Sequence, residues 1–269
     1  MRAIILAAGR GSRLRPFTDN HPKCFTELDG IPLLERQIAT LRAAGVNDIW
    51  IVTGYRREMI QPPGTRQCYN SRWAETNMVE SLFCMAENFG DDLLVSYSDI
   101  VYEPRVLDSL LSSSHPVAVV VDNNWRKYWE MRFNNPLSDA ETLKMDGAGR
   151  IIDIGNPAQS LDEIEAQYIG LMRFQGEGVK ILHNNYTNLG AKKRAWMSKR
   201  PISQAYITDL LMEMILRGES VWAAPVSGGW LEFDNVNDIE IVEAMLAEGS
   251  LAQFYDPKAI PVTPKSGGG

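Results

Sequence analysis

Cysteine is scarce in this sequence of 269 residues, and its distribution argues against two common uses of the residue. The three cysteines, Cys24, Cys68 and Cys84, match no zinc-binding spacing. Their odd number argues against a disulfide framework of the kind that stabilises small secreted domains. We therefore expect all three thiols to be reduced, as thiols are in the cytoplasm.

Long apolar runs are also missing, so we expect no segment to cross a membrane. The short apolar run at residues 3–6 is soon followed by Arg10, Arg13 and Arg15, without a small-residue cleavage site. This pattern is typical of a buried strand and argues against a signal peptide. Together with the reduced cysteines, it predicts a cytoplasmic protein.

The sequence has no excess of positive charge, since 27 Lys and Arg residues stand against 34 Asp and Glu residues, a formal net charge of −7. This balance argues against a nucleic-acid partner, because that affinity depends on many cations placed against phosphates. A local basic pocket for a small anion is compatible with it. The length suits one large α/β domain or two small ones, and a homo-oligomer is equally compatible.

The first half of the chain contains a regular alternation of apolar strands and amphipathic helices. Strands are predicted at residues 3–6, 49–52, 93–95 and 117–121, and helices at 34–41, 78–88 and 106–111. This alternation predicts an α/β fold with a Rossmann-like, doubly wound, mostly parallel sheet. Ligands of such sheets bind beyond the carboxyl ends of the strands.

The pattern changes between residues 123 and 170, where 130–133 and 150–154 are predicted as antiparallel strands of a small sheet or lid. Helices are predicted again at 207–217 and 238–248. We therefore expect one domain over residues 1–250. The tail at 257–269 is rich in Pro, Gly, Lys and Ser and is predicted to be disordered.

The segment L-A-A-G-R-G-S-R-L-R-P at residues 6–16 carries the strongest functional signal. Backbone N–H groups near Gly9 and Gly11 can hold phosphate oxygens, and Arg13 and Arg15 add forked hydrogen-bond donors. Two glycines after a strand are also typical of an ordinary tight turn, but three arginines within six residues favour the functional interpretation. Leu14 replaces the third glycine of a dinucleotide fingerprint, and no Gly-Lys-Ser/Thr follows, so a dehydrogenase and a P-loop are both disfavoured.

The longer run L-A-A-G-R-G-S-R-L-R-P-F-T-D-N-H-P-K resembles a family signature, G-x-G-[ST]-R-L-x-P-x-T-x-x-x-P-K. This signature is that of the sugar-phosphate nucleotidyltransferase superfamily. Further likeness to the family at residues 31–55 and 207–226 extends the resemblance over most of the chain. The resemblance implies that the loop wraps the triphosphate of an NTP, with Arg13 and Lys23 as catalytic cations. The implied nucleotide-binding set at this loop is Leu6, Ala8, Gly9, Gly11 and Ser12.

Two aspartates, Asp99 and Asp234, each follow a predicted strand and match family positions that hold a metal ion. Because Mg²⁺ prefers one or two carboxylates with phosphate oxygens and water, the resemblance implies a Mg²⁺ site there. Each aspartate is also typical of a turn or helix cap, and Asn235 and Asn237 compete with Asp234 for that role. The E-x-D-x-x-x-D spacing resembles the choline-phosphate and phosphonate cytidylyltransferase branch, and it departs from the W-x-D-x-G-T of hexose-1-phosphate thymidylyltransferases.

The resemblance also suggests contacts to the base and to the acceptor. Asn77 and Ser81 lie where the family reads the base, although Asn77 with a glutamate three residues later also predicts a helix cap. We assign acceptor binding to Trp125, Trp129 and Glu130, because aromatic rings beside a carboxylate can hold an ammonium group. Aromatic residues that only anchor a core give the same pattern.

The sequence thus predicts a cytidylyltransferase that transfers CMP from CTP to a small phosphate or phosphonate acceptor and releases pyrophosphate. Choline phosphate, an aminoalkylphosphonate and an amino-acid-derived phosphate all fit as acceptors. Two alternatives stay open: a guanylyl-, uridylyl- or thymidylyltransferase acting on a sugar 1-phosphate, and an inactive nucleotide-binding regulatory subunit. The intact set of Arg13, Lys23, Asp99 and Asp234 argues against the second alternative.

Overall fold

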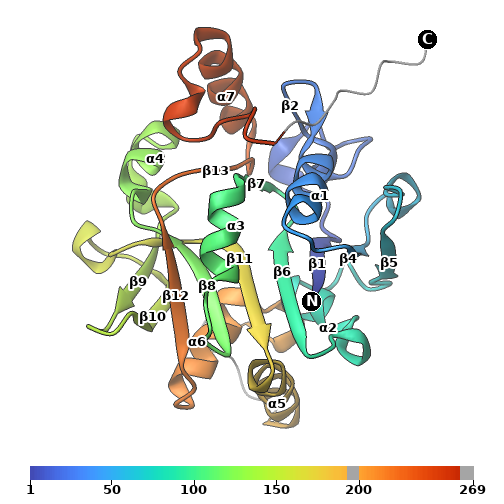
Figure 1. Ribbon diagram of the computed structural model, residues 1–269, viewed down its shortest axis with the longest axis vertical. Coiled ribbons are helices and arrows are strands. Elements are labelled where there is room, and N and C mark those ends of the chain that lie inside the picture. Colours follow the sequence, from blue (N-terminus) through green and yellow to red (C-terminus); the bar gives the residue numbers. More distant parts are fainter. Residues whose placement is uncertain (193–199, 261–269) are drawn as a thin grey trace.

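A nine-stranded sheet forms the centre of the protein, and the computed structural model describes residues 1–192 and 200–260 (Figure 1). The strands lie in the order β5-β4-β1-β6-β11-β8-β12-β10-β9. Their bounds are β1 Arg2–Ala7, β4 Asp48–Thr53, β5 Arg66–Tyr69, β6 Asp92–Tyr97, β8 Val117–Asp122, β9 Glu141–Met145, β10 Arg150–Pro157, β11 Gln167–Gln175 and β12 Val221–Val226. Within this sheet only β11 and β10 run against the direction of the others, so the mostly parallel sheet that the sequence predicts is confirmed.

Helices cover both faces of the sheet because successive side chains of the buried strands point to opposite sides. On β1, Ala3 and Ile5 join one hydrophobic cluster, whereas Ile4 and Leu6 join another. The first cluster packs under α1 (Leu33–Ala43), α3 (Pro104–Leu111), α4 (Trp125–Arg132) and α7 (Val236–Glu248). The second packs under α2 (Met78–Phe83), α5 (Glu177–Lys192) and α6 (Ile207–Leu216). Over the described residues, none of these helices combines the length and apolar character needed to cross a bilayer.

Two short antiparallel pairs lie beside the main sheet, and one of them positions the site. β2 (Glu27–Leu28) pairs with β3 (Ile31–Pro32), and β7 (Ile100–Tyr102) pairs with β13 (Trp230–Glu232). The backbone N–H of Phe233 donates to the carbonyl of Asp99 at 2.9 Å, which extends the second pair by one step. The β7–β13 pair therefore brings together two aspartates that lie far apart in the sequence.

The segment at residues 130–133 was predicted as a strand, and that prediction is wrong because residues 130–132 form the last turn of helix α4 and Phe133 is its C-cap. Trp125, Tyr128, Trp129 and Arg132 are all buried, and their spacing of three and four residues is that of one helix face. The predicted strand at 150–154 is present within β10. β9 and β10 form an antiparallel hairpin that continues the main sheet, since Ile151 of β10 pairs with Val221 of β12.

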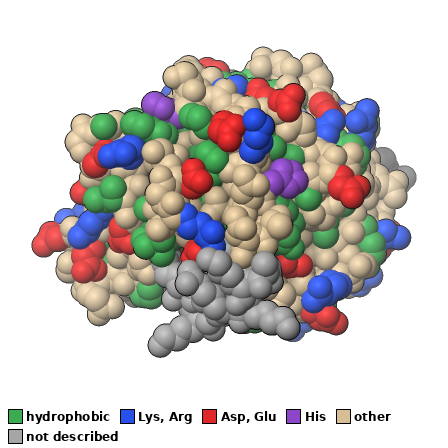
Figure 2. Space-filling view, turned by 90° about the horizontal axis from the view of Figure 1, so that it is seen from below, with side chains coloured by type: hydrophobic (Ala, Val, Ile, Leu, Met, Phe, Trp, Pro, Cys, Tyr) green, Lys and Arg blue, Asp and Glu red, His purple; other side chains and the backbone are tan. Residues whose placement is uncertain are grey.

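The remainder of the chain packs against the domain as far as residue 260. Arg36 donates from Nη1 to the carbonyl of Pro257 at 3.0 Å, and Ala259 N–H donates to Asp256, so the first part of the predicted tail forms a turn. Residues 261–269 of that predicted disordered tail lie outside the described residues. The face shown in Figure 2 carries acidic and basic side chains interspersed, with no continuous basic area.

Candidate active site

The glycine–arginine loop after β1 folds back over Lys23. Gly11 has φ 69°, and a Cβ at this position would lie 2.8 Å from the Cβ of Lys23. The Thr18 hydroxyl and the Leu14 N–H both donate to the Gly11 carbonyl, at 2.7 and 3.0 Å. Leu14 is fully buried and anchors the short helical turn Ser12–Leu14 in the core. Glycine is required at position 11 because of both the left-handed backbone and the close approach of the lysine stem.

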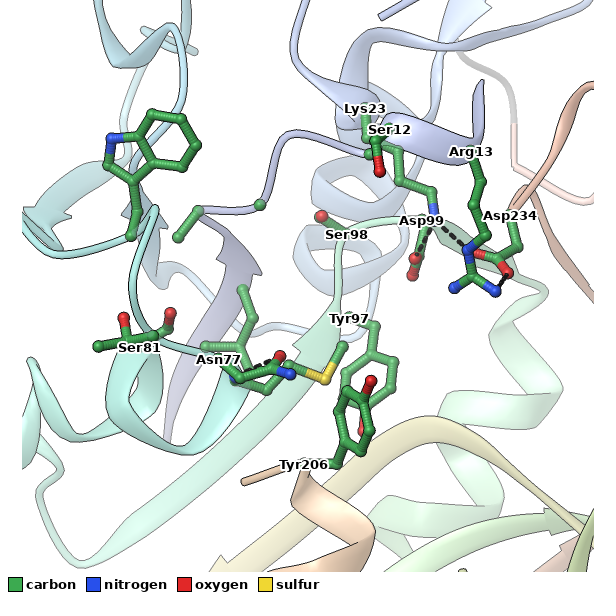
Figure 3. A pocket seen from close by; sticks show the side chains of 17 residues that line it. Ser12, Arg13, Lys23, Asn77, Ser81, Tyr97, Ser98, Asp99, Tyr206 and Asp234 are labelled. Carbon is green, nitrogen blue, oxygen red and sulfur yellow. Dashed lines mark hydrogen bonds and ion pairs between the residues drawn. The ribbon is translucent and has the colours of Figure 1, made fainter. Parts of the chain in front are cut away.

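Lys23 lies between two carboxylates at the carboxyl edge of the sheet (Figure 3). Its Nζ donates to Asp99 Oδ2 at 2.7 Å and to Asp234 Oδ1 at 2.8 Å, and all three side chains are largely buried. Burial alone would lower the pKa of Lys23, but the charges of Asp99 and Asp234 outweigh it and hold this pKa above its ordinary value. The ammonium therefore stays charged at neutral pH.

Arg13 is the second cation of this cluster. Its Nη1 lies 2.5 Å from Asp234 Oδ2, and its side chain is 69% exposed, so the guanidinium is free to reorient toward a ligand. Arg10 and Arg15, by contrast, both pair with Asp19, at 3.9 and 3.1 Å. Of the three loop arginines, the structure brings only Arg13 to the cleft.

The helix-cap explanation does not hold for Asp234, because Asn235 caps α7. The Asn235 side chain accepts from the Asp238 N–H, and the Asp238 side chain accepts from the Asn235 N–H in return. Asp234 is thereby left to face Lys23 and Arg13, and these cations lower its pKa against the opposing effect of burial. Asp99 caps no helix either, and its Oδ1 is buried without a hydrogen-bond partner among the described residues.

These two aspartates fit a hard divalent cation. A buried carboxylate oxygen without a partner is costly, and a cation at Asp99 Oδ1 would satisfy it. Across residues 1–192 and 200–260, no cluster of three or more His, Cys, Asp or Glu side chains is placed to hold a metal. A two-carboxylate site suits Mg²⁺, which takes its other ligands from phosphate oxygens and water.

A cleft of about 310 Å³ joins this charged cluster to the region predicted to read the base. It is lined by all eleven residues predicted to bind nucleotide or metal or to act in catalysis: Leu6, Ala8, Gly9, Gly11, Ser12, Arg13, Lys23, Asn77, Ser81, Asp99 and Asp234. Asn77 does cap α2, since its Oδ1 accepts from the Met78 N–H at 2.8 Å, and it lines the cleft as well. The Ser81 hydroxyl accepts from Asn70 Nδ2 at 3.0 Å. The roles of these residues in binding stay predictions.

The three residues assigned to acceptor binding are not among those that line the cleft. Trp125 and Trp129 are each 4% exposed and pack in the hydrophobic core beneath α4. Glu130 is exposed and pairs with Arg126 one turn earlier at 2.8 Å. The structure therefore does not bring the three residues to the cleft: Trp125 and Trp129 anchor the core, and Glu130 forms a surface ion pair.

The sequence did not indicate three aromatic residues that line the cleft, Trp73, Tyr97 and Tyr206. Two glycines make room for the first two: a Cβ on Gly54 would lie 2.5 Å from the Trp73 side chain, and a Cβ on Gly170 would lie 2.5 Å from the Tyr97 ring. Glycines at strand ends and inside strands do signal such close approaches, but they do not name the partner. Tyr206 precedes α6 and has no local signal.

A doubly wound sheet whose carboxyl edge carries a glycine-rich loop and two cations paired with two aspartates has the arrangement of a nucleotidyltransferase. The sequence comparison agrees, because residues 3–163 match the model of the MobA-like NTP transferase domain. The chain belongs to this family and is a nucleotidyltransferase, as its sequence predicts.

Individual relatives extend the likeness to nearly the whole chain. The CTP:phosphoglutamine cytidylyltransferase of Campylobacter jejuni subsp. jejuni is 37% identical over 253 residues, 90% of this chain and 98% of that protein. The choline-phosphate cytidylyltransferase of Streptococcus pneumoniae is 30% identical over 156 residues, 56% of this chain and 67% of its own length. Among solved structures, a CTP:phosphocholine cytidylyltransferase from Streptococcus pneumoniae superimposes with a TM-score of 0.67 at 22% identity, covering 91% of this chain and 98% of its own.

Proposed function

We propose that this protein transfers CMP from CTP to a small phosphate or phosphonate acceptor and releases pyrophosphate. The observation that carries the proposal is the convergence of Arg13, Lys23, Asp99 and Asp234 on one cleft beside the Gly9–Gly11 loop. Cations and backbone donors at this edge suit a triphosphate, and paired carboxylates suit the metal ion that accompanies it.

CTP is the nucleotide that the relatives support, because both relatives described above are named as cytidylyltransferases. Glu232, Asp234 and Asp238 supply the E-x-D-x-x-x-D spacing that predicts the same branch. In our proposal Asn77 and Ser81 contact the base, since both line the end of the cleft that lies away from Lys23 (Figure 3).

The proposed reaction is a direct displacement at the α-phosphorus. An acceptor oxygen forms a bond to this phosphorus as the bond to the bridging oxygen of the β-phosphate breaks, and pyrophosphate leaves with that electron pair. A phosphate or phosphonate acceptor is already anionic at neutral pH, so no general base is needed. Arg13 and Lys23 hold the two anions at bonding distance and offset the charge that builds on the α-phosphate.

The metal ion in the proposal is Mg²⁺, held by Asp99 and Asp234. When bound, it neutralises phosphate charge and orients the triphosphate for displacement. The carboxylates that it would contact are those that now accept from Lys23. Lys23 would then turn its ammonium toward the phosphates, where a compact charge on a flexible stem is well suited.

A matrix of four NTPs against several acceptors tests the proposal, with pyrophosphate release measured in the presence of Mg²⁺. Acceptors would include choline phosphate, aminoethylphosphonate, phosphorylated amino acids and a hexose 1-phosphate. We expect turnover with CTP and a phosphate or phosphonate acceptor. A preference for another NTP with the hexose 1-phosphate would favour the sugar-nucleotide alternative, and tight NTP binding without pyrophosphate release would favour the regulatory subunit.

A further inference from the structure

A second cavity of about 370 Å³ lies beside the proposed nucleotide cleft and shares one wall with it. Tyr206, at the start of α6, lines both cavities. The second cavity is otherwise built from residues 137–141, the end of β10 at 155–157, Arg200 and Asp209. α6 packs tightly on β10 here, since a Cβ on Gly155 would lie 2.6 Å from the Thr208 side chain. The acceptor must deliver one oxygen to the α-phosphorus in the cleft, so its remainder needs a neighbouring space of this kind.

Three acidic side chains line this cavity, Asp139, Glu141 and Asp209, and their carboxylates differ in their hydrogen-bond partners. Asp139 accepts from the Trp129 indole N–H at 3.1 Å, and Asp209 accepts from the Tyr206 N–H at 2.9 Å. Glu141 differs, because no described residue donates a hydrogen bond to its carboxylate. Burial, together with the charges of Asp139 and Asp209, raises the pKa of Glu141 to about 7 against the opposing effect of Arg200. A ligand cation beside Glu141 would supply the missing partner and restore its charge.

Among the described residues that line the cavity, Arg200 is the one cation. The guanidinium of Arg200 lies over the Tyr206 ring at 4.1 Å and reaches Asp209 Oδ2 only at 3.8 Å. A pair at this distance with a half-exposed arginine is weak. Arg200 is therefore available for a forked, two-bond contact with a carboxylate that enters the cavity.

We propose that this second cavity binds the head group of a zwitterionic acceptor, with an ammonium at Glu141 and Asp139 and a carboxylate at Arg200. The acceptor would then be a phosphorylated or phosphonylated amino acid, not a simple amino alcohol phosphate. This inference rests on the proposed function, since it concerns the acceptor of the same reaction. Tyr206 would lie between the head group and the nucleotide.

Acceptors that differ in one charged group test the ammonium contact and the carboxylate contact separately. O-phosphoserine carries both charged groups, ethanolamine phosphate lacks the carboxylate, and 3-phosphoglycerate lacks the ammonium. Phosphoglutamine and the phosphorylated amide of 4-aminobutyrate form a second pair that differs in the α-carboxylate alone. With saturating CTP, we expect kcat/KM for the zwitterionic member of at least one series to exceed that of its truncated relatives by roughly 10-fold or more.

Two variants assign the contacts to residues. Arg200→Gln should lower kcat/KM for the preferred zwitterion roughly 10- to 100-fold through the acceptor KM, while the KM for CTP and the use of ethanolamine phosphate stay unchanged. Glu141→Gln should lower kcat/KM for the ammonium-bearing acceptors of both series and leave that for 3-phosphoglycerate unchanged. Arg57→Gln is the matched control, because Arg57 is exposed and lies over Tyr69 at the same 4.1 Å.

The outcomes distinguish this inference from the proposed function. Equal use of truncated and zwitterionic acceptors, or equal losses on all acceptors in Arg200→Gln, would overturn the inference while CTP turnover upheld the function. If CTP gave no turnover with any acceptor, calorimetric binding of phosphoglutamine and O-phosphoserine would decide. Binding lost in Arg200→Gln but kept in Arg57→Gln would uphold the cavity, and the absence of binding would reject it.

Discussion

Replacing Arg132 with methionine should cost the protein a large part of its stability. This arginine of α4 is 1% exposed, and it forms a forked pair with Asp238, from Nε to Oδ1 at 2.9 Å and from Nη2 to Oδ2 at 3.1 Å. Its Nη1 donates to Glu232 at 2.8 Å. Removing one partner of a buried pair leaves the other charge uncompensated, which costs about 3–5 kcal/mol. For a chain of this size that loss lowers Tm by roughly 6–20 °C.

Loss of the Arg132–Asp238 pair should also disturb the candidate active site, because Asp238 fixes the backbone that carries Asp234. Asp238 Oδ2 accepts from the Asp234 N–H at 2.8 Å and from the Asn235 N–H at 3.0 Å. Adding Asp238→Asn to Arg132→Met removes the buried charge while an amide oxygen can still accept from this backbone. We therefore expect the double variant to regain part of the lost Tm.

Thermal and urea unfolding measure these effects, and a second arginine of α4 provides the control. Arg126 pairs with Glu130 at the surface, with side chains 61% and 51% exposed. Arg126→Met should change stability by less than about 0.5 kcal/mol, because exposed helix pairs contribute little. A Tm for Arg132→Met as close to the wild type as that of the control would refute this account of the buried pair.

Three further predictions concern the cleft and its neighbouring cavity. Asp99→Asn should lower turnover by about 10²–10³-fold or more while the fold is kept, measured by pyrophosphate release and circular dichroism; near-normal turnover would reject the assigned role. Gly11→Ala should lower activity strongly because its Cβ would displace Lys23. The control Gly90→Ala, at φ 71° with no atom within 4 Å of its Cβ, should cost only backbone strain of about 1 kcal/mol. Equal losses of activity in the two variants would contradict this difference in contact. The raised pKa of Glu141, about 7, means that the folded state holds a proton that the unfolded state loses near pH 4.5, so stability falls as pH rises through this window. Glu141→Gln should therefore be more stable than the wild type by about 3 kcal/mol at pH 8 and show no advantage at pH 4, in urea unfolding at both values.

The loop after β1 was predictable because its chemistry is contiguous. Gly9, Gly11, Arg13 and Lys23 lie within fifteen residues of each other, and strand-end position plus residue type identify them together. The two aspartates were predictable for a related reason, since Asp99 and Asp234 each come shortly after an apolar strand. Residues at such strand ends gather at one edge of the sheet. The sequence does not show the β7–β13 pairing that brings Asp99 and Asp234 to the same lysine.

The acceptor side was not predictable in the same way, and the reason is physical. Trp125 and Trp129 have the composition of an ammonium site, yet the helical spacing of the surrounding residues buries them in the core. The second cavity is assembled from three segments around residues 137–141, 155–157 and 200–209. No local pattern signals such an assembly, since each contributing residue is ordinary in its own segment.

Overall charge would also have misled a search for the acceptor site. A net charge of −7 describes a chain with no general affinity for anions. The cleft nevertheless places Arg13 and Lys23, beside Asp99 and Asp234, where phosphates are proposed to bind, while the adjoining cavity places Glu141 and Asp139 where an ammonium is proposed to bind. A substrate with a phosphate at one end and an ammonium at the other would fit this arrangement, with Tyr206 between its two ends. With Asp99 and Asp234 taken up by the proposed metal ion, a reversed substrate would bring its ammonium against Arg13 and Lys23, so the cleft would disfavour that orientation for attack.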